Sequence, residues 1–168
     1  PMTAPIASAL FDKALSLIDS FEYTLAVQFL QRALTSPGAD ADVLRISILT
    51  QLGHLHVELD ELDAAVDVYD QVLTLDPDNV EVLLASAQCL TGASGALDRY
   101  KRALDLSTDA STRASIACAM VDVYLTDLID EASALPSASA LLNAVPESYE
   151  TLHYRAQIAL FQDDRPSA

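Results

Sequence analysis

The chain has 168 residues, of which 51% are hydrophobic, with four glycines and no tryptophan, and this composition excludes a disordered or fibrous protein. It carries 25 acidic residues against nine lysines and arginines, so its formal net charge is −16. Such a chain repels phosphate groups, which makes nucleic acid and anionic membranes poor partners and a basic protein a good one.

A repeat of about 34 residues, a common period of paired-helix repeats, runs through the chain, and its first copy covers roughly residues 7–40. Apolar residues recur in this copy at helical spacing, as on the buried faces of two successive helices. They are Leu10, Ala14, Leu17, Ala26, Leu30, Ala33 and Leu34. A segment with proline and glycine, residues 36–40, separates this copy from the next.

The second copy, residues 46–79, is the most regular one. Gly53 and Ala65 have almost no side chain, so two antiparallel helices can cross closely at these positions, and Tyr69 fills the space that remains. Pro77 cannot continue the second helix and therefore marks the turn to the next one. These residue types at these offsets resemble the tetratricopeptide repeat, which is a pair of antiparallel helices.

Three less regular copies follow at residues 80–111, 114–147 and 149–168. In the third copy the turn between the two helices, residues 91–95, is short. The fifth copy is incomplete, because the small residue of its second helix is expected at Ala168, and we expect a fragment of a longer chain. The sequence predicts an all-α fold, a right-handed superhelical solenoid of tetratricopeptide helix pairs, with about four and a half repeats in a single domain over residues 3–168.

The motifs that suggest catalysis or metal binding fail on spacing. The segment 76–79 begins like a calcium loop, but Val80 stands where a further ligand belongs. His54 and His56 lie two positions apart on a helix, which points them about 200° apart, so they cannot share a metal ion. The glycines of residues 92–95 lack the lysine of a phosphate-binding loop. We therefore predict that the chain is not an enzyme and has no metal and no cofactor.

Tetratricopeptide domains generally bind extended peptides along a concave face that the first helix of each pair lines. We predict that this face contacts a partner protein through His54, Glu58, Glu81, Leu84, Gln88, Asp122, Leu125, Glu150 and Tyr154, with Asp127, Asp130 and Glu131 at its rim. No lysine or arginine stands at the predicted contact positions, which disfavours binding of the acidic tail of a heat-shock chaperone.

Two long stretches of the sequence carry acidic residues only. Residues 46–98 contain ten acidic residues and residues 114–154 contain six, and neither stretch contains a lysine or arginine. One interpretation is that the acids only keep an alanine-rich solenoid soluble. The other is a negatively charged surface that attracts and neutralises a strongly basic segment of a partner.

The two cysteines, Cys89 and Cys118, lie in apolar helical sequence without a pairing pattern. They are typical of buried thiols in a reducing compartment, although the sequence leaves a single disulfide open. No apolar stretch reaches the length of about 18 residues that a membrane-spanning helix needs, so we expect a soluble protein.

The fourth copy contains the most distinctive sequence, residues 121–131, which reads VDVYLTDLIDE. Together with residues 95–100 of the third copy, it resembles the fungal family of assembly chaperones of large-subunit ribosomal protein number four, over roughly residues 43–160. The resemblance implies an acidic tetratricopeptide solenoid that captures the newly made, basic ribosomal protein by its long internal loop. It also implies a cytoplasmic and nuclear location, because such chaperones accompany their client into the nucleus.

An alternative function belongs to a different class. The chain could be a scaffold or adaptor that joins helical partners in a multi-subunit complex, with its acidity serving only solubility. Salt-sensitive partner binding would favour the chaperone, and a large apolar interface that is insensitive to salt would favour the adaptor.

Overall fold

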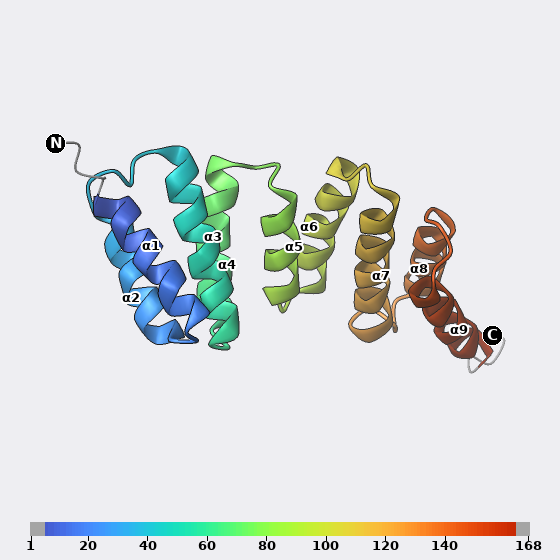
Figure 1. Cartoon of the computed structure of the whole chain (residues 1–168). Helices are drawn as coiled ribbons and strands as arrows, with labels where there is room; N and C mark the ends of the chain where they lie inside the picture. The colour runs from blue at the N-terminus through green and yellow to red at the C-terminus, as the bar shows by residue number, and fades with distance from the viewer. Residues whose placement is uncertain (1–5, 164–168) are drawn as a thin grey trace. The chain divides into compact units, whose positions relative to one another are not determined.

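The computed structural model describes residues 6–163, and in this range the chain forms nine α-helices and no strand (Figure 1). The helices are α1 (Ile6–Asp19), α2 (Tyr23–Leu34), α3 (Asp42–Glu58), α4 (Leu62–Leu75), α5 (Val80–Cys89), α6 (Ala93–Leu106), α7 (Ala110–Thr126), α8 (Ala134–Asn143) and α9 (Tyr149–Asp163). The predicted all-α fold is confirmed. The second helix expected near Ala168 lies outside the described residues.

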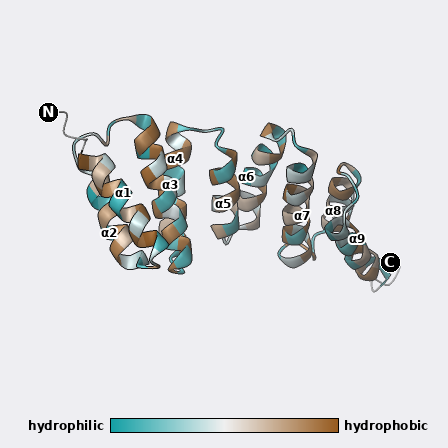
Figure 2. Ribbon diagram, viewed as in Figure 1, coloured by the Kyte–Doolittle hydropathy of each residue, from teal (hydrophilic) through white to brown (hydrophobic). Residues whose placement is uncertain are grey.

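The chain divides into two compact units between Leu90 and Thr91, which we call the N-terminal and C-terminal units. In the N-terminal unit, α1 packs against α2, α2 against α3, α3 against α4, and α4 against α5. Each of these helices carries both hydrophobic and hydrophilic residues (Figure 2). The buried faces share one core, to which Leu30, Ile48, Leu49, Tyr69, Val72 and Val82 contribute.

The crossing of α3 and α4 follows the packing that the small residues predict. Ala65 and Tyr69 are completely buried. A Cβ atom added to Gly53 would overlap the aromatic ring of Tyr69, so the ring occupies the space that the missing side chain leaves. The close approach of the two helices therefore depends on a glycine on one helix and an alanine on the other.

Ala65→Leu should lower the free energy of unfolding by about 1–3 kcal/mol, because three additional carbons must enter a site with no free volume. The change can be measured by urea unfolding of the variant and the wild type. An unchanged unfolding midpoint would show that position 65 does not lie at a tight helix crossing.

The turns of the first two helix pairs share one backbone geometry. Phe21 and Asp60 both have a φ of 60°, and each lies in the turn between the two helices of its pair. Directly after them, the backbone N–H of Glu22 donates to the carbonyl of Leu17 over 2.9 Å, and that of Glu61 to the carbonyl of His56 over 2.8 Å. This bond satisfies a carbonyl at the end of the first helix, and its recurrence is independent structural support for a repeat.

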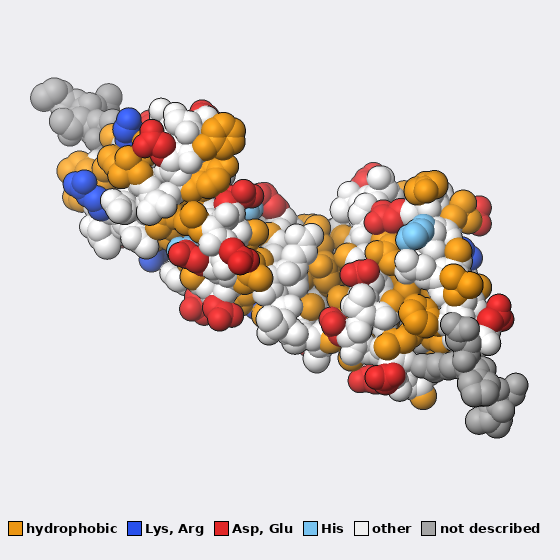
Figure 3. Space-filling view, turned by 90° about the horizontal axis from the view of Figure 1, so that it is seen from below, with side chains coloured by type: hydrophobic (Ala, Val, Ile, Leu, Met, Phe, Trp, Pro, Cys, Tyr) orange, Lys and Arg blue, Asp and Glu red, His pale blue; other side chains and the backbone are white. Residues whose placement is uncertain are grey.

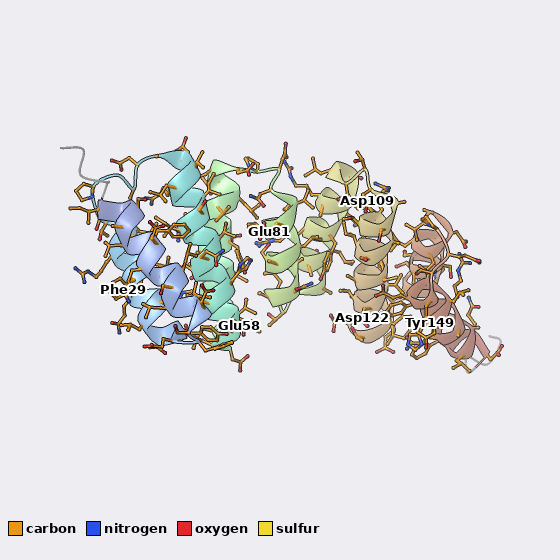
Figure 4. The ribbon with its side chains drawn as sticks, in the orientation of Figure 1. Phe29, Glu58, Glu81, Asp109, Asp122 and Tyr149 are labelled. Atoms are coloured by element: carbon orange, nitrogen blue, oxygen red, sulfur yellow. The ribbon has the colours of Figure 1, made fainter. Side chains whose placement is uncertain are left out.

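The C-terminal unit contains α6 to α9, in which α6 packs on α7, α7 on α8, and both α7 and α8 on α9. Asp109 directly precedes helix α7 and caps it (Figure 4), because its carboxylate accepts from the backbone N–H of Thr112 over 2.8 Å. This bond and a second one from the Thr112 hydroxyl lower the pKa of Asp109. The same device starts α5, where Asn79 accepts from the backbone N–H of Val82, so both helices begin with a side chain that satisfies a free amide.

The structure tests the predicted turn at residues 91–95 and the predicted state of the two cysteines. The short turn at residues 91–95 is mostly helix, because α6 begins at Ala93 and Gly92 precedes its first turn; small residues such as Ala93 and Gly95 do not obstruct a helix start. Cys89 and Cys118 are both buried thiols, and neither is part of a disulfide. Along the described residues, every helix is too short or too polar to cross a membrane.

Candidate protein-binding surfaces

The N-terminal unit has a pocket of about 310 Å³ at the C-terminal end of α3, where α4 and α5 also reach it. We call it the Tyr69 pocket, and its lining residues are His54, Val57, Glu58, Leu62, Tyr69, Ala85, Gln88 and Cys89. It brings together three of the predicted contact residues, His54, Glu58 and Gln88. No lysine or arginine stands among its lining residues.

His54 connects this pocket to Glu81 at the start of α5. Its Nε2 atom lies 3.7 Å from Oε1 of Glu81, and the side chains are 37% and 69% exposed. The imidazole ring also meets the ring of Tyr69 edge-on, with 5.9 Å between the centroids. Figure 4 shows Glu58 near the end of α3 and Glu81 in the first turn of α5. Two carboxylates therefore lie near His54, since Glu58 lines the same pocket and Glu81 contacts the imidazole ring.

Tyr69 is a polar residue of this pocket that the sequence did not indicate as functional. It is completely buried, and its hydroxyl has no hydrogen-bond partner. Burial raises the pKa of this hydroxyl, and electrostatic interaction with Cys89 and Glu81 raises it further. The sequence suggested only a packing residue, yet a buried tyrosine usually finds a partner for its hydroxyl, so the missing partner is visible only in the structure.

His56, two residues further along α3, belongs to a different environment. It is buried, with 9% exposed, and its Nδ1 lies 2.5 Å from Oε2 of Glu61. The two histidines therefore contact different acidic residues, Glu81 and Glu61. Among residues 6–163 no three histidine, cysteine or acidic side chains are grouped so that they could hold a metal ion.

The C-terminal unit has a hollow of about 390 Å³ between the last turns of α7 and α9. We call it the Asp122 hollow, and its lining residues are Asp122, Leu125, Thr126, Gln157, Leu160 and Phe161. The Tyr154 hydroxyl donates to Oδ1 of Asp122 over 3.2 Å. The structure thus joins Asp122, Leu125 and Tyr154, three predicted contact residues that are up to 32 positions apart.

Leu125 was predicted to contact a partner, but in the structure it is buried. It is only 7% exposed and belongs to a core cluster with Leu142 and Ile158. The exposed apolar side chains of this hollow are instead Leu160, 66% exposed, and Phe161, 38% exposed. The floor of the hollow is therefore provided by α7, and its accessible apolar surface by α9.

The remaining predicted acids of this unit lie in separate places. Glu131 lines a different hollow, with Asp98 and Lys101 of α6, and Glu150 lines a third one beside the first turns of α7. Asp127 follows the last residue of α7, and Asp130 is exposed in the turn to α8. The structure therefore does not bring Glu131 to the surface around Asp122, as the sequence suggested, because the chain turns after α7 towards the face of α6.

Leu84 is half-buried on α5, one turn after Glu81, and it lines neither of the two surfaces described above. On the face seen in Figure 3, each unit shows acidic side chains among hydrophobic ones. The lining of each named surface has one carboxylate, Glu58 or Asp122, beside apolar side chains. This combination suits a chain segment whose side chains have long aliphatic stems and positive ends.

Tyr154 gives the C-terminal unit a measurable pH dependence. Burial, and then the negative charge of Asp122, raise its pKa to about 12, whereas an unfolded tyrosine titrates near 10. From about pH 10 to 12 the unfolded state loses this proton and the folded state keeps it, so stability falls as the pH rises. In urea unfolding across this range, Tyr154→Phe should lose less stability than the wild type; identical slopes would contradict the assignment.

Burial raises the pKa of the Cys118 thiol to about 11, with a smaller contribution from Glu150. A thiol with this pKa is protonated near neutral pH and is a poor nucleophile. Cys118 also lies in the core cluster beneath the Asp122 hollow. Its role in this unit is therefore packing.

Comparison with known proteins identifies the type of repeat. A tetratricopeptide-repeat family model matches residues 46–89, which correspond to most of α3 and all of α4 and α5. No curated protein matches the chain. The matched segment contains the whole Tyr69 pocket, since all lining residues of the pocket lie between residues 54 and 89.

Solved structures match over nearly the whole chain. The assembly chaperone of RpL4 (Acl4), residues 1–338, is 24% identical with a TM-score of 0.72, and the match covers 94% of this chain and 69% of that one. A tetratricopeptide repeat protein from Parabacteroides merdae is 19% identical with a TM-score of 0.78, over 94% and 60% of the two chains. PilF of Pseudomonas aeruginosa is 19% identical with a TM-score of 0.61, over 90% and 66%.

At these identities the matches establish the fold, which is an all-α repeat solenoid. The chain spans 60–69% of the length of these three proteins. Tetratricopeptide repeats, which residues 46–89 match, generally bind protein partners.

Proposed function

We propose that this chain is a dedicated chaperone that binds a newly made basic ribosomal protein and shields its extended loop until assembly into the large ribosomal subunit. The observation that carries the proposal is the chemistry of the Tyr69 pocket and the Asp122 hollow. Each has one carboxylate, Glu58 or Asp122, beside apolar lining residues, and neither has a lysine or arginine in its lining. Such surfaces complement lysine and arginine side chains in both charge and shape.

Two further findings support this proposal. The net charge of −16 attracts a basic partner over long distances and raises the rate of association. The likeness to the assembly chaperone of RpL4 and the resemblance of residues 121–131 to that chaperone family favour ribosomal protein number four as the client. The corresponding location is the cytoplasm and the nucleus, and direct contact with nucleic acid or membrane is not part of the proposal.

Salt dependence of binding tests this function. The chain should bind purified ribosomal protein number four, and affinity should fall strongly when ionic strength rises from about 0.1 M to 0.5 M, because the screening length falls from about 10 Å to near 4 Å. Fluorescence anisotropy with the labelled basic loop measures both affinities. Absence of binding at low salt, or equal binding of a neutral loop, would contradict the proposal.

One observation favours the adaptor as a second candidate. Four large apolar side chains of α9 are exposed, namely Tyr149, Leu152, Leu160 and Phe161, and exposed apolar patches often mark protein interfaces. An adaptor that uses this helix would hold its partner through apolar contacts. Its binding would then persist at high salt, in contrast to that of the chaperone.

A further inference from the structure

The hydroxyl of Tyr69 is a polar group without a function in the free protein. The side chain is completely buried, and its oxygen has no hydrogen-bond partner. Leaving such a group unsatisfied costs stability, so each case in a folded protein requires an explanation. Tyr69 lines a pocket that is large enough to admit a small group, about 310 Å³, near the lower limit of ligand sites.

The charges around the hydroxyl indicate what kind of group is missing. Glu81 and Cys89 are near enough to affect the titration of Tyr69, and Glu58 lines the same pocket. An anion would be repelled by these carboxylates. A cation with N–H groups would be attracted by them and could donate a hydrogen bond to the tyrosine oxygen.

The walls of the pocket distinguish between the two cationic side chains. Val57, Leu62 and Ala85 are apolar and suit an aliphatic stem. The ring of His54 meets that of Tyr69 edge-on, with 5.9 Å between the centroids, and, being 37% exposed, offers aromatic surface to the pocket. Guanidinium is planar, weakly hydrated and able to stack on rings while donating in several directions, whereas ammonium is compact and strongly hydrated.

We propose that the Tyr69 pocket takes an arginine side chain of the basic client, with the Tyr69 hydroxyl accepting a hydrogen bond from the guanidinium and Glu58 and Glu81 balancing its charge. This inference rests on the proposed function, since it names the side chain that the basic segment inserts. Glu58 and Gln88 are exposed and can change rotamer to let the guanidinium reach the hydroxyl.

The test compares two peptides. In the first, arginine alternates with glycine and serine. The second is identical except that lysine replaces every arginine. Wild-type protein should bind the arginine peptide more tightly. Tyr69→Phe keeps the ring and removes only the hydroxyl, so it should weaken the arginine peptide about tenfold, as for a lost hydrogen bond to a charged group. Its melting temperature should be unchanged or higher, because the hydroxyl has no partner in the free protein.

Tyr100→Phe is the matched control, since Tyr100 is also buried, with 5% exposed, but does not line the pocket. It should leave the affinity for both peptides unchanged. Glu81→Gln, at an exposed position, provides a second variant in case Tyr69→Phe does not fold, and it should also reduce the preference for arginine.

Two results would overturn the arginine site alone. One is equal affinity of wild type for the two peptides, and the other is unaltered arginine binding in both Tyr69→Phe and Glu81→Gln. If ribosomal protein number four still binds in a salt-sensitive manner, the chaperone function stands without this site. If neither that protein nor either peptide binds, the proposed function fails together with the arginine site.

Discussion

Reversing the charge of three acidic residues, in the variant Glu58→Lys, Glu81→Lys and Asp122→Lys, is expected to weaken binding of the basic client at least tenfold. An exposed ion pair contributes about 0–1 kcal/mol, so no single carboxylate decides the affinity. Each reversal, however, replaces an attraction by a repulsion, and three of them act on the two surfaces that have no lysine or arginine in their lining. The association rate should fall most, since long-range attraction governs encounter.

A matched control separates the local effect from that of net charge. Asp63→Lys, Asp67→Lys and Asp105→Lys change the net charge by the same amount at exposed positions of α4 and α6. This control should bind much more tightly than the test variant. Circular dichroism must show equal helicity for both variants. Equal affinities of the two variants would mean that only the overall charge matters, and undiminished binding of the test variant would refute the acidic-surface mechanism.

The second large effect concerns stability. Gly53→Ala is expected to lower the free energy of unfolding by about 1–3 kcal/mol, because the new methyl group would overlap the ring of Tyr69. The sign is informative, since alanine in a helix is usually about 1 kcal/mol more favourable than glycine. For a domain of about 60–100 residues, each kcal/mol corresponds to roughly 4–8 °C in melting temperature.

Gly92→Ala is the control for this experiment, because a Cβ atom at Gly92 would meet no atom within 4 Å. Its melting temperature should stay close to that of the wild type. If Gly53→Ala melts at the same temperature as well, the Tyr69 ring can move at little cost. The pocket that this ring lines would then be less rigid than the structure indicates.

The helices and their first crossing were predictable because the signals are local. The apolar spacing of a helix, the turn at Pro77 and the small residues Gly53 and Ala65 act within one repeat, so a short segment contains the whole pattern. The predicted burial of Ala65 agrees with the structure, in which its side chain is completely covered. Even so, the start of α6 at Ala93 was missed, because glycine and serine in residues 91–95 suggested a turn.

The acidic character and the absence of lysine and arginine from two long stretches are likewise properties of the sequence alone. The sequence alone does not determine which of the acidic residues share a surface. Leu125 is buried because Leu142 and Ile158, from two other helices, pack in the same cluster, and the path after α7 carries Glu131 to a hollow beside α6.

The Tyr69 pocket shows most clearly the difference between what the sequence determines and what tertiary packing determines. The sequence identified His54 as a contact residue and Tyr69 as packing, each from its place on its own helix. Only tertiary packing puts the two rings 5.9 Å apart and brings α5 with Glu81 next to them. Helical periodicity determines which side of a helix faces inward. The surroundings of a buried hydroxyl depend instead on which other helices cover it. For Tyr69 they are decided by the packing of α3, α4 and α5 together.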